Sequence, residues 1–215
     1  MSQDKIQIDE AKAEKYKEKW KAISVDTKET DKALASKAIN EIYEAKGLPA
    51  PYILFVENPI HGVRIAEYAM QKESAGNLKR VLDWVATNEF KTKKATKVDF
   101  HGYGQLDAYW LVYWDYLIDN HREVVEKDIP VIKPTMDLSL QANYYWLLDL
   151  MAIVTVKPKV FAVENDKFHN LFEPAIKFND FEVYCLNGEV VNQEEWAKKT
   201  APYKSTVAKT VFQKL

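Results

Sequence analysis

Residues Gln105 to Ile118 read QLDAYWLVYWDYLI, and this stretch decides the fold that we predict. Its apolar and aromatic side chains recur with helical spacing, which predicts a helix. Two carboxylates and two indoles share one face, and three tyrosines form a neighbouring stripe. Because both faces are aromatic or aliphatic, we expect a central helix, covered on most sides by the rest of the domain. The shared face holds Asp107, Trp110, Leu111, Trp114 and Asp115, and the stripe holds Tyr109, Tyr113 and Tyr116.

Two amphipathic helices are predicted before this stretch. Apolar residues recur every three or four positions from Asp9 to Ile23, which indicates the first helix. Asp31 is a favourable N-cap for a second helix, which ends near Gly47, a residue that suits the left-handed position after a helix. Because only the polar segment Asp26 to Glu29 joins them, an antiparallel helical hairpin is the simplest arrangement.

A strand and two more helices follow. The run YILFV at Tyr52 to Val56 is continuously apolar, which is typical of a strand buried on both faces. Asn58 and Pro59 then provide an N-cap and a first helical residue. Another amphipathic helix is predicted from Asn77 to Thr87.

The chain beyond the aromatic helix allows two interpretations. Two prolines favour a connector around Ile129 to Ile132. The segment LSLQANYYWLLDLM, from Leu138 to Met151, predicts a buried helix. Its aromatic triplet Tyr144 to Trp146 equally fits the beginning of a strand.

After Met151 the pattern changes to short apolar runs separated by turn residues, which indicates β-hairpins. We expect strands Ala152 to Val156 and Val160 to Val163 to form one hairpin, followed by a turn at Glu164 to Lys167. Asn187 and Gly188 give the strongest hairpin signal in the chain. Further strands are predicted at Ala175 to Phe178, Phe181 to Leu186, and Val190 to Val191.

These elements predict a single α+β domain over residues 1–215. N-terminal helices surround the central aromatic helix, and a small antiparallel β-sheet of C-terminal hairpins follows them. The helical part covers about residues 9–151, the hairpin part about 152–191, and a C-terminal helix or tail 192–215.

Composition narrows the class of protein. The 215 residues carry a formal net charge of -2, with 47% hydrophobic and 29% charged residues, which matches globular proteins. This charge provides no general attraction to nucleic acid or to an anionic membrane. Cys185 lies in an apolar run, so we expect a buried thiol. The N-terminal residues lack the apolar segment of a secretory signal, and no apolar run approaches about eighteen residues. We therefore expect a cytoplasmic protein with no membrane partner.

Three blocks of the sequence carry a resemblance to a known family. The first combines Trp20, Ile23 and Tyr43 with GLPAP at residues 47–51 and Asn58-Pro59; the second is GQLDAYWL at residues 104–111; the third includes Phe168-His169-Asn170, Pro174-Ala175-Ile176 and Asn187-Gly188. In this order the blocks resemble a widespread uncharacterised bacterial and phage family, domain of unknown function 6745. They are spread across residues 17 to 191, most of the chain.

The sequence also departs from that family. The family usually has His where Leu106 stands, Gly where Glu173 stands, and Asp-Gly where Asp180-Phe181 stands. The missing histidine argues against a metal or proton-transfer role for the aromatic helix. Because the family has no assigned activity, the resemblance implies a fold and no mechanism.

No motif in the sequence specifies a reaction. Neither a nucleophile elbow, nor a phosphate-binding loop, nor a dinucleotide fingerprint occurs. The four histidines never fall at metal-ligand spacing. We therefore predict no catalytic residue, no metal and no cofactor.

The leading prediction is a non-enzymatic binding protein, an accessory factor of a phage or bacterium that takes a protein partner or sequesters a small-molecule ligand. Aromatic residues, 13% of the chain, dominate binding hot spots although most form cores. His101 stands beside Gly102 and Gly104, and a glycine loop allows close approach of a ligand. The candidate binding residues are His101, Gln105, Asp107, Trp110, Trp114, Asp115, Trp146, His169 and Asn170.

Two alternatives stay open. Asp107 and Asp115 could form the acid/base pair or metal ligands of a hydrolase or transferase, although such carboxylates more often accept hydrogen bonds from Trp or Tyr. The cluster KTKKATK at Lys91 to Lys97, with the aromatic residues, could bind nucleic acid or a nucleotide. A charge cluster of this kind is more often a solvated loop.

Overall fold

The structure is a computed structural model that describes residues 8–92 and 103–212, without the side chains of residues 106, 107 and 204–212. By its contacts the chain divides into two compact units. Unit 1 comprises Met1–Asp26 and Thr30–Val156, and unit 2 comprises Thr27–Glu29 and Lys157–Leu215. Helices and small antiparallel strand pairs occur together, which confirms the α+β class. Within the described part of the chain, no helix has the length and apolar character needed to cross a membrane.

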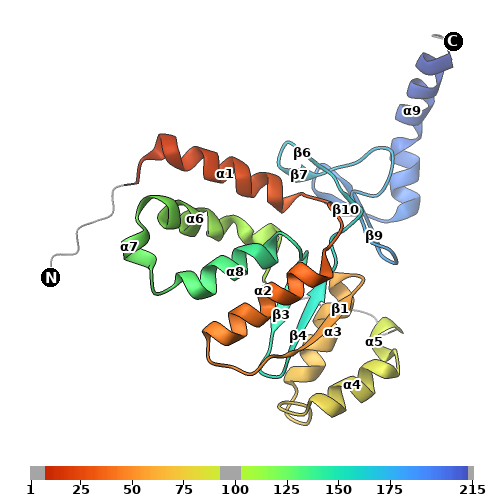
Figure 1. Ribbon diagram of the computed structural model, residues 1–215. Helices are drawn as coiled ribbons and strands as arrows, with labels where there is room; N and C mark the ends of the chain where they lie inside the picture. Colours follow the sequence, from red (N-terminus) through yellow and green to blue (C-terminus); the bar gives the residue numbers. More distant parts are fainter. Residues whose placement is uncertain (1–7, 93–102, 213–215) are drawn as a thin grey trace. The chain divides into compact units, whose positions relative to one another are not determined.

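Unit 1 is built on a mixed sheet with the strand order β1-β4-β3-β2, in which β1 runs parallel to β4 and the other pairs are antiparallel. Its strands are β1 (Tyr52–Val56), β2 (Tyr103–Gly104), β3 (Tyr144–Leu147) and β4 (Met151–Thr155) (Figure 1). Its helices are α1 (Glu10–Ser24), α2 (Lys32–Ala45), α3 (Pro59–Met70), α4 (Leu78–Ala86), α5 (Glu89–Thr92), the 3-10 helix η1 (Leu106–Trp110), α6 (Leu111–Asn120), α7 (Arg122–Val125) and α8 (Ile129–Ser139).

Helices cover both faces of this sheet. Successive side chains of a strand point to opposite faces, so Ala152 and Val154 of β4 pack with α2 and α8, whereas Met151 and Ile153 pack with α3 and α4. Every residue of β4 is buried. This accounts for the apolar run of β4, because a strand covered on both faces has no solvent side. The edge strand β1, which was predicted to be buried on both faces, is only partly buried, and its Tyr52 is exposed.

The helix α1 belongs to a third core cluster. Its residues Ala13, Tyr16 and Trp20 pack against α6 and neighbouring helices, whereas α2 packs against α8 and the sheet. The predicted antiparallel pairing of the first two helices is therefore wrong. The apolar stripe of each helix is covered by elements distant in the sequence, which local spacing does not specify.

Four of the predicted helix starts are confirmed. The side chains of Asp9, Asp31, Asn58 and Asn77 each accept a hydrogen bond from a backbone N–H two or three residues ahead, as N-caps do. Gly47, with φ of +67°, follows α2 in the left-handed region.

Two predictions around the prolines are wrong. The residues expected to form a connector begin α8, where Pro130 occupies the first turn and Pro134 lies inside the helix. The helix predicted from Leu138 to Met151 is absent; the alternative, a strand beginning at Tyr144, is correct. A helix tolerates proline in its first turn, and pairing with β4 outweighs the helical pattern of the later segment.

The aromatic stretch is two elements rather than one. The 3-10 helix η1 carries residues 106–110 and only then does α6 begin. Trp110 ends the 3-10 helix at the surface, whereas Trp114 is partly buried and Asp115 is buried in α6. One side of α6 is buried, but Tyr109 and Tyr113 are exposed, so the stretch is not covered on most sides.

Unit 2 contains two small antiparallel sheets and a C-terminal helix. The strand orders are β10-β9-β8-β5 and β6-β7. The elements are β5 (Val160–Phe161), β6 (Val163–Glu164), β7 (Lys167–Phe168), β8 (Ile176–Lys177), β9 (Glu182–Leu186), β10 (Glu189–Val191) and α9 (Gln193–Phe212).

The hairpin at Asn187 and Gly188 is confirmed: the two residues have φ of 52° and 87° and join β9 to β10 with a two-residue loop. The turn predicted between Glu164 and Lys167 is also confirmed and closes the pair β6-β7. The predicted hairpin of residues 152–156 with 160–163 is wrong, because β4 pairs with β1 and β3 while β5 pairs with β8.

Candidate functional site

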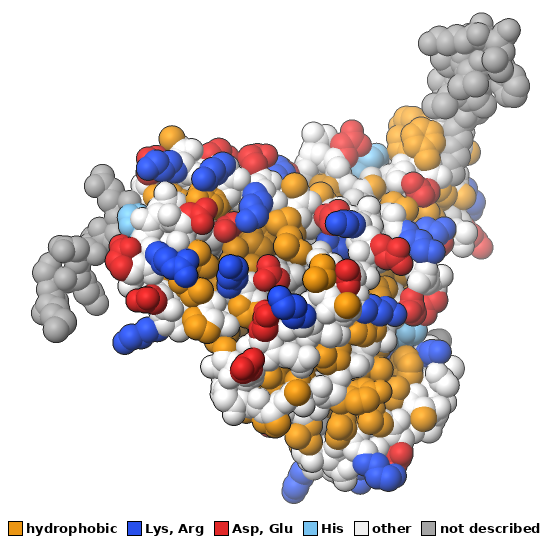
Figure 2. All heavy atoms as spheres, in the orientation of Figure 1, with side chains coloured by type: hydrophobic (Ala, Val, Ile, Leu, Met, Phe, Trp, Pro, Cys, Tyr) orange, Lys and Arg blue, Asp and Glu red, His pale blue; other side chains and the backbone are white. Residues whose placement is uncertain are grey.

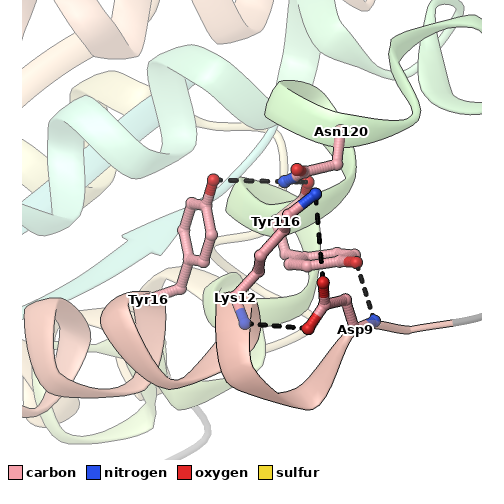
Figure 3. A network of polar contacts seen from close by, with 5 residues as sticks. All are labelled: Asp9, Lys12, Tyr16, Tyr116 and Asn120. Carbon is pink, nitrogen blue, oxygen red and sulfur yellow. Dashed lines mark hydrogen bonds and ion pairs between the residues drawn. The ribbon is translucent and has the colours of Figure 1, made fainter.

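The interface between α1 and α6 is fixed by tyrosines. The rings of Tyr16 and Tyr116 meet edge to face with centroids 5.7 Å apart. The backbone N–H of Asp9 donates to the Tyr116 hydroxyl at 3.0 Å, and Nδ2 of Asn120 donates to the Tyr16 hydroxyl at 3.2 Å (Figure 3). The Tyr16 hydroxyl in turn donates to Asp119 at 2.9 Å. This network holds α6 in one position against α1.

Asp115 belongs to the same interface. Its Oδ2 accepts hydrogen bonds from Nε1 of Trp20 at 2.9 Å and from Nζ of Lys19 at 2.6 Å. The carboxylate is mostly buried and the Trp20 side chain almost fully. A buried indole N–H needs an acceptor, so this geometry gives Asp115 a structural task.

Gln105 is also an internal connector. Its side chain is fully buried, and Nε2 donates to the backbone carbonyls of Ile23 at 2.8 Å and Asp26 at 2.6 Å. Its Oε1 accepts from Nδ2 of Asn143 at 3.3 Å, and its backbone N–H donates to the Asn143 carbonyl. Gln105 thus ties the end of α1 to the segment that precedes β3.

Trp146 and Trp114, two of the three predicted tryptophans, pack against the cores of unit 1. Trp146 is 5% exposed and sits over Gly62, where an added Cβ would lie 2.3 Å from its ring. Trp114 is partly buried against the α1–α6 cluster. Neither lines the grooves described below.

His169 and Asn170 both support loops of unit 2. Nδ1 of His169 accepts a hydrogen bond from the backbone N–H of Asn187 at 3.0 Å, at the hairpin turn. The side chain of Asn170 accepts a hydrogen bond from the backbone N–H of Phe172. The backbone carbonyl of Asn170 accepts another from Nε1 of Trp196 at 2.8 Å.

Some predicted residues lie outside the described part. This holds for His101, for the side chain of Asp107, and for residues 93–97 of the lysine cluster. The described residues contain no group of three or more His, Cys, Asp or Glu side chains that could hold a metal ion.

Trp110 is the predicted residue that the structure places at the surface. It is 36% exposed, beside Tyr103 at 61%, Tyr109 at 65% and Tyr113 at 45%. We call these four residues the Trp110 surface. Large apolar side chains that are exposed singly are ordinary, but a contiguous group marks a binding region. Hydrophobic patches between charged side chains are a general feature of the molecular face drawn in Figure 2.

The larger of two grooves at this surface, the sheet-side groove, has a volume of about 440 Å³. It lies among α2, α8, β3 and the Trp110 ring. The Tyr103 ring stands 6.3 Å from that of Trp110 and 6.4 Å from that of Tyr145, centroid to centroid. The lining consists of three aromatic, four aliphatic and two polar residues: Tyr103, Trp110 and Tyr145; Ile42, Val131, Ile132 and Leu147; Lys46 and Thr135.

The second groove, the α1-side groove, has a volume of about 260 Å³ and shares Trp110 with the first. Its one charged lining residue is Lys17, which forms an ion pair with Glu14 at 3.1 Å. The hydrogen bond to Glu14 raises the pKa of Lys17. The lining residues are Ile8, Ala13, Lys17, Tyr109, Trp110, Val112, Tyr113 and Tyr116.

The chain was compared with protein families, curated proteins and solved structures. No protein-family model, no curated protein and no solved structure matches the chain. The resemblance to domain of unknown function 6745 stays a prediction.

Of the nine residues that line the sheet-side groove, only Trp110 was a predicted site residue. Among the others, Tyr103 was expected in a glycine turn and Tyr145 in a helix or strand, and Lys46 was not singled out. Tyr103, Tyr145 and Lys46 meet through the pairing of Tyr103 with Tyr145 across β2 and β3 and through the packing of α2 on the sheet. The available sequence signal was the stripe of Tyr109 and Tyr113 beside Trp110.

Proposed function

We propose that this chain is a non-enzymatic binding protein whose recognition site is the Trp110 surface with its two grooves. One observation carries the proposal: four exposed aromatic rings adjoin two apolar grooves that meet at one indole. Tryptophan and tyrosine provide large contact areas with few rotatable bonds, which is why they dominate binding hot spots.

The fixed position of α6 beneath the Trp110 surface supports the proposal. Trp110 directly precedes α6, and the tyrosine network holds α6 on α1. A groove whose walls are fixed before binding loses less conformational entropy when a ligand enters.

The test is a thermal-shift screen of the full chain against a set of flat apolar compounds and fifteen-residue peptides, repeated with Trp110→Ala. We expect at least one compound or peptide to raise the melting temperature of the wild type and to have a much smaller effect on the variant. Tyr52→Ser serves as the control, because Tyr52 is also exposed on an edge strand of the same sheet but lines neither groove. Equal shifts for wild type and Trp110→Ala in every case would contradict the proposal.

A further inference from the structure

The two grooves of the Trp110 surface differ in charge. In the α1-side groove Glu14 already compensates the ammonium of Lys17. In the sheet-side groove the one charged lining residue is Lys46, and no ion pair of Lys46 is present among the described residues. No Asp or Glu of residues 8–92 and 103–212 lines this groove. The sheet-side groove therefore offers one uncompensated positive charge beside an apolar wall.

The aromatic wall of the sheet-side groove favours a planar ligand. The ring of Tyr103 lies 6.3 Å from that of Trp110 and 6.4 Å from that of Tyr145, centroid to centroid. Planar ligands stack on such rings. The volume of about 440 Å³ lies in the range of small-ligand pockets, about 300 to 1,000 Å³.

Few polar groups line the groove. Among the described lining residues, the polar side-chain groups are the ammonium of Lys46, the phenol hydroxyls of Tyr103 and Tyr145, and the hydroxyl of Thr135, which already donates to the backbone carbonyl of Val131 at 2.7 Å. A peptide backbone would bring a donor and an acceptor for each residue and would need partners for them. A ring system with one charged group needs a partner for that group alone.

We infer that the sheet-side groove binds a flat aromatic anion, of the chemical class of aromatic carboxylates and sulfonates, with its rings on Tyr103 and Trp110 and its charge at Lys46. The inference rests on the proposed function, because it names the ligand class for the same surface.

A matched pair of fluorescent probes tests it. Anilinonaphthalene sulfonate is an aromatic anion with a planar naphthalene ring, and N-phenylnaphthylamine has the same ring system without the charge. We expect the anion to bind the full chain more tightly than the neutral probe by about two- to fivefold, the effect of one exposed ion pair. Added salt should remove this difference, because it screens exposed charges.

Variants locate the site. Lys46→Gln should weaken the anion by about two- to fivefold and leave the neutral probe unchanged, whereas Lys133→Gln, an exposed lysine of α8 outside the groove lining, should change neither. Trp110→Ala should weaken both probes by about fivefold or more, the usual loss when one stacking ring is removed. Tyr103→Ser provides a second test on an edge strand whose exposed side chain lies outside the core.

The outcomes separate the two proposals. If both probes bind equally, or if Lys46→Gln leaves the anion unaffected, the groove takes a neutral ligand such as an apolar protein segment, and the inference is overturned while the proposed function stands. If neither probe binds, or if Trp110→Ala and Tyr103→Ser change neither, the inference is overturned and the proposed function loses its site.

Discussion

At the scale of single residues, the carboxylate of Asp115 shows how an apparent catalytic group can have a structural task. Its oxygen accepts from the indole N–H of Trp20 and from the ammonium of Lys19. An indole N–H that is buried without an acceptor would lose its hydrogen bond to water and gain nothing in return. Asp115 therefore provides the acceptor that allows Trp20 to be buried in the α1–α6 interface.

Asp115→Asn tests this role. The substitution removes the ion pair with Lys19 and weakens the bond from Trp20, so we expect the free energy of unfolding to fall by about 1 to 3 kcal/mol. Urea unfolding followed by circular dichroism measures it. Trp20→Phe, alone and combined with Asp115→Asn, completes a double-mutant cycle whose coupling should be favourable. An unchanged urea midpoint for Asp115→Asn would show that the contact contributes nothing.

Gly104 is a second residue with a structural role, because its neighbours leave no room for a side chain. A Cβ at this position would lie 2.5 Å from the Asn143 carbonyl oxygen and 2.4 Å from the Tyr144 ring, so β2 can lie close to β3 only with glycine. We expect Gly104→Ala to displace β2 and, with it, Tyr103. The neutral naphthylamine probe should then bind several-fold more weakly, although no groove side chain has changed. Equal affinity in fluorescence titrations of Gly104→Ala and wild type would mean that β2 does not position the groove.

At the scale of elements, the turn between β3 and β4 depends on a distant tyrosine. The hydroxyl of Tyr43, on α2, donates to the carbonyl of Leu148 and lies 3.3 Å from that of Met151. The turn contains no glycine or proline, which explains why local sequence predicted a helix through it. The contact joins residues 105 positions apart, so no pattern within the segment could show it.

Burial, with a smaller contribution from the negative charge of Asp149, raises the pKa of Tyr43 to about 12. In the unfolded chain the pKa is about 10. Tyr43 therefore contributes fully to stability below pH 10, and this contribution is lost as the pH rises from 10 through 12. At about 1.4 kcal/mol per pKa unit the loss amounts to about 2 to 3 kcal/mol.

Tyr43→Phe should isolate this contribution. At pH 8 the variant should be less stable than wild type by about 1 kcal/mol, because the hydrogen bond to Leu148 is missing. Between pH 10 and 12 the difference should shrink and then change sign, since phenylalanine does not ionise. Urea unfolding at a series of pH values measures it. A difference that stays constant up to pH 12 would contradict the assignment.

Elements specified by local chemistry were predictable, and those specified by pairing were not. The caps Asp31 and Asn58 and the turn Asn187-Gly188 act within a few residues, so their elements follow from the sequence. The parallel pairing of β1 with β4 joins distant segments. The residues of the candidate site divide in the same way. Trp110 was predicted from the aromatic pattern of its own segment, whereas Lys46 reaches the groove only through tertiary packing.

At the scale of the whole molecule, the two units differ in the size of their cores. Among the described residues, proline and glycine aside, thirty buried apolar residues belong to unit 1 and five to unit 2. Small cores bury a smaller fraction of the unfolded surface and are correspondingly marginal. The five residues of unit 2 are Phe161, Ala175, Phe178, Cys185 and Trp196.

Cys185, the one cysteine of the chain, reports on unit 2 alone. It is buried, and burial raises the pKa of its thiol, so it should react with a thiol reagent only when unit 2 opens. Five of the six tryptophans lie in unit 1, so tryptophan emission follows mainly unit 1. Over a urea series we expect Cys185 to become reactive at a lower concentration than that at which the emission changes, because the smaller core should open first. Cys185→Ala provides the baseline of the labelling assay. Coincident midpoints for labelling and emission would instead show that the two units unfold as one cooperative structure.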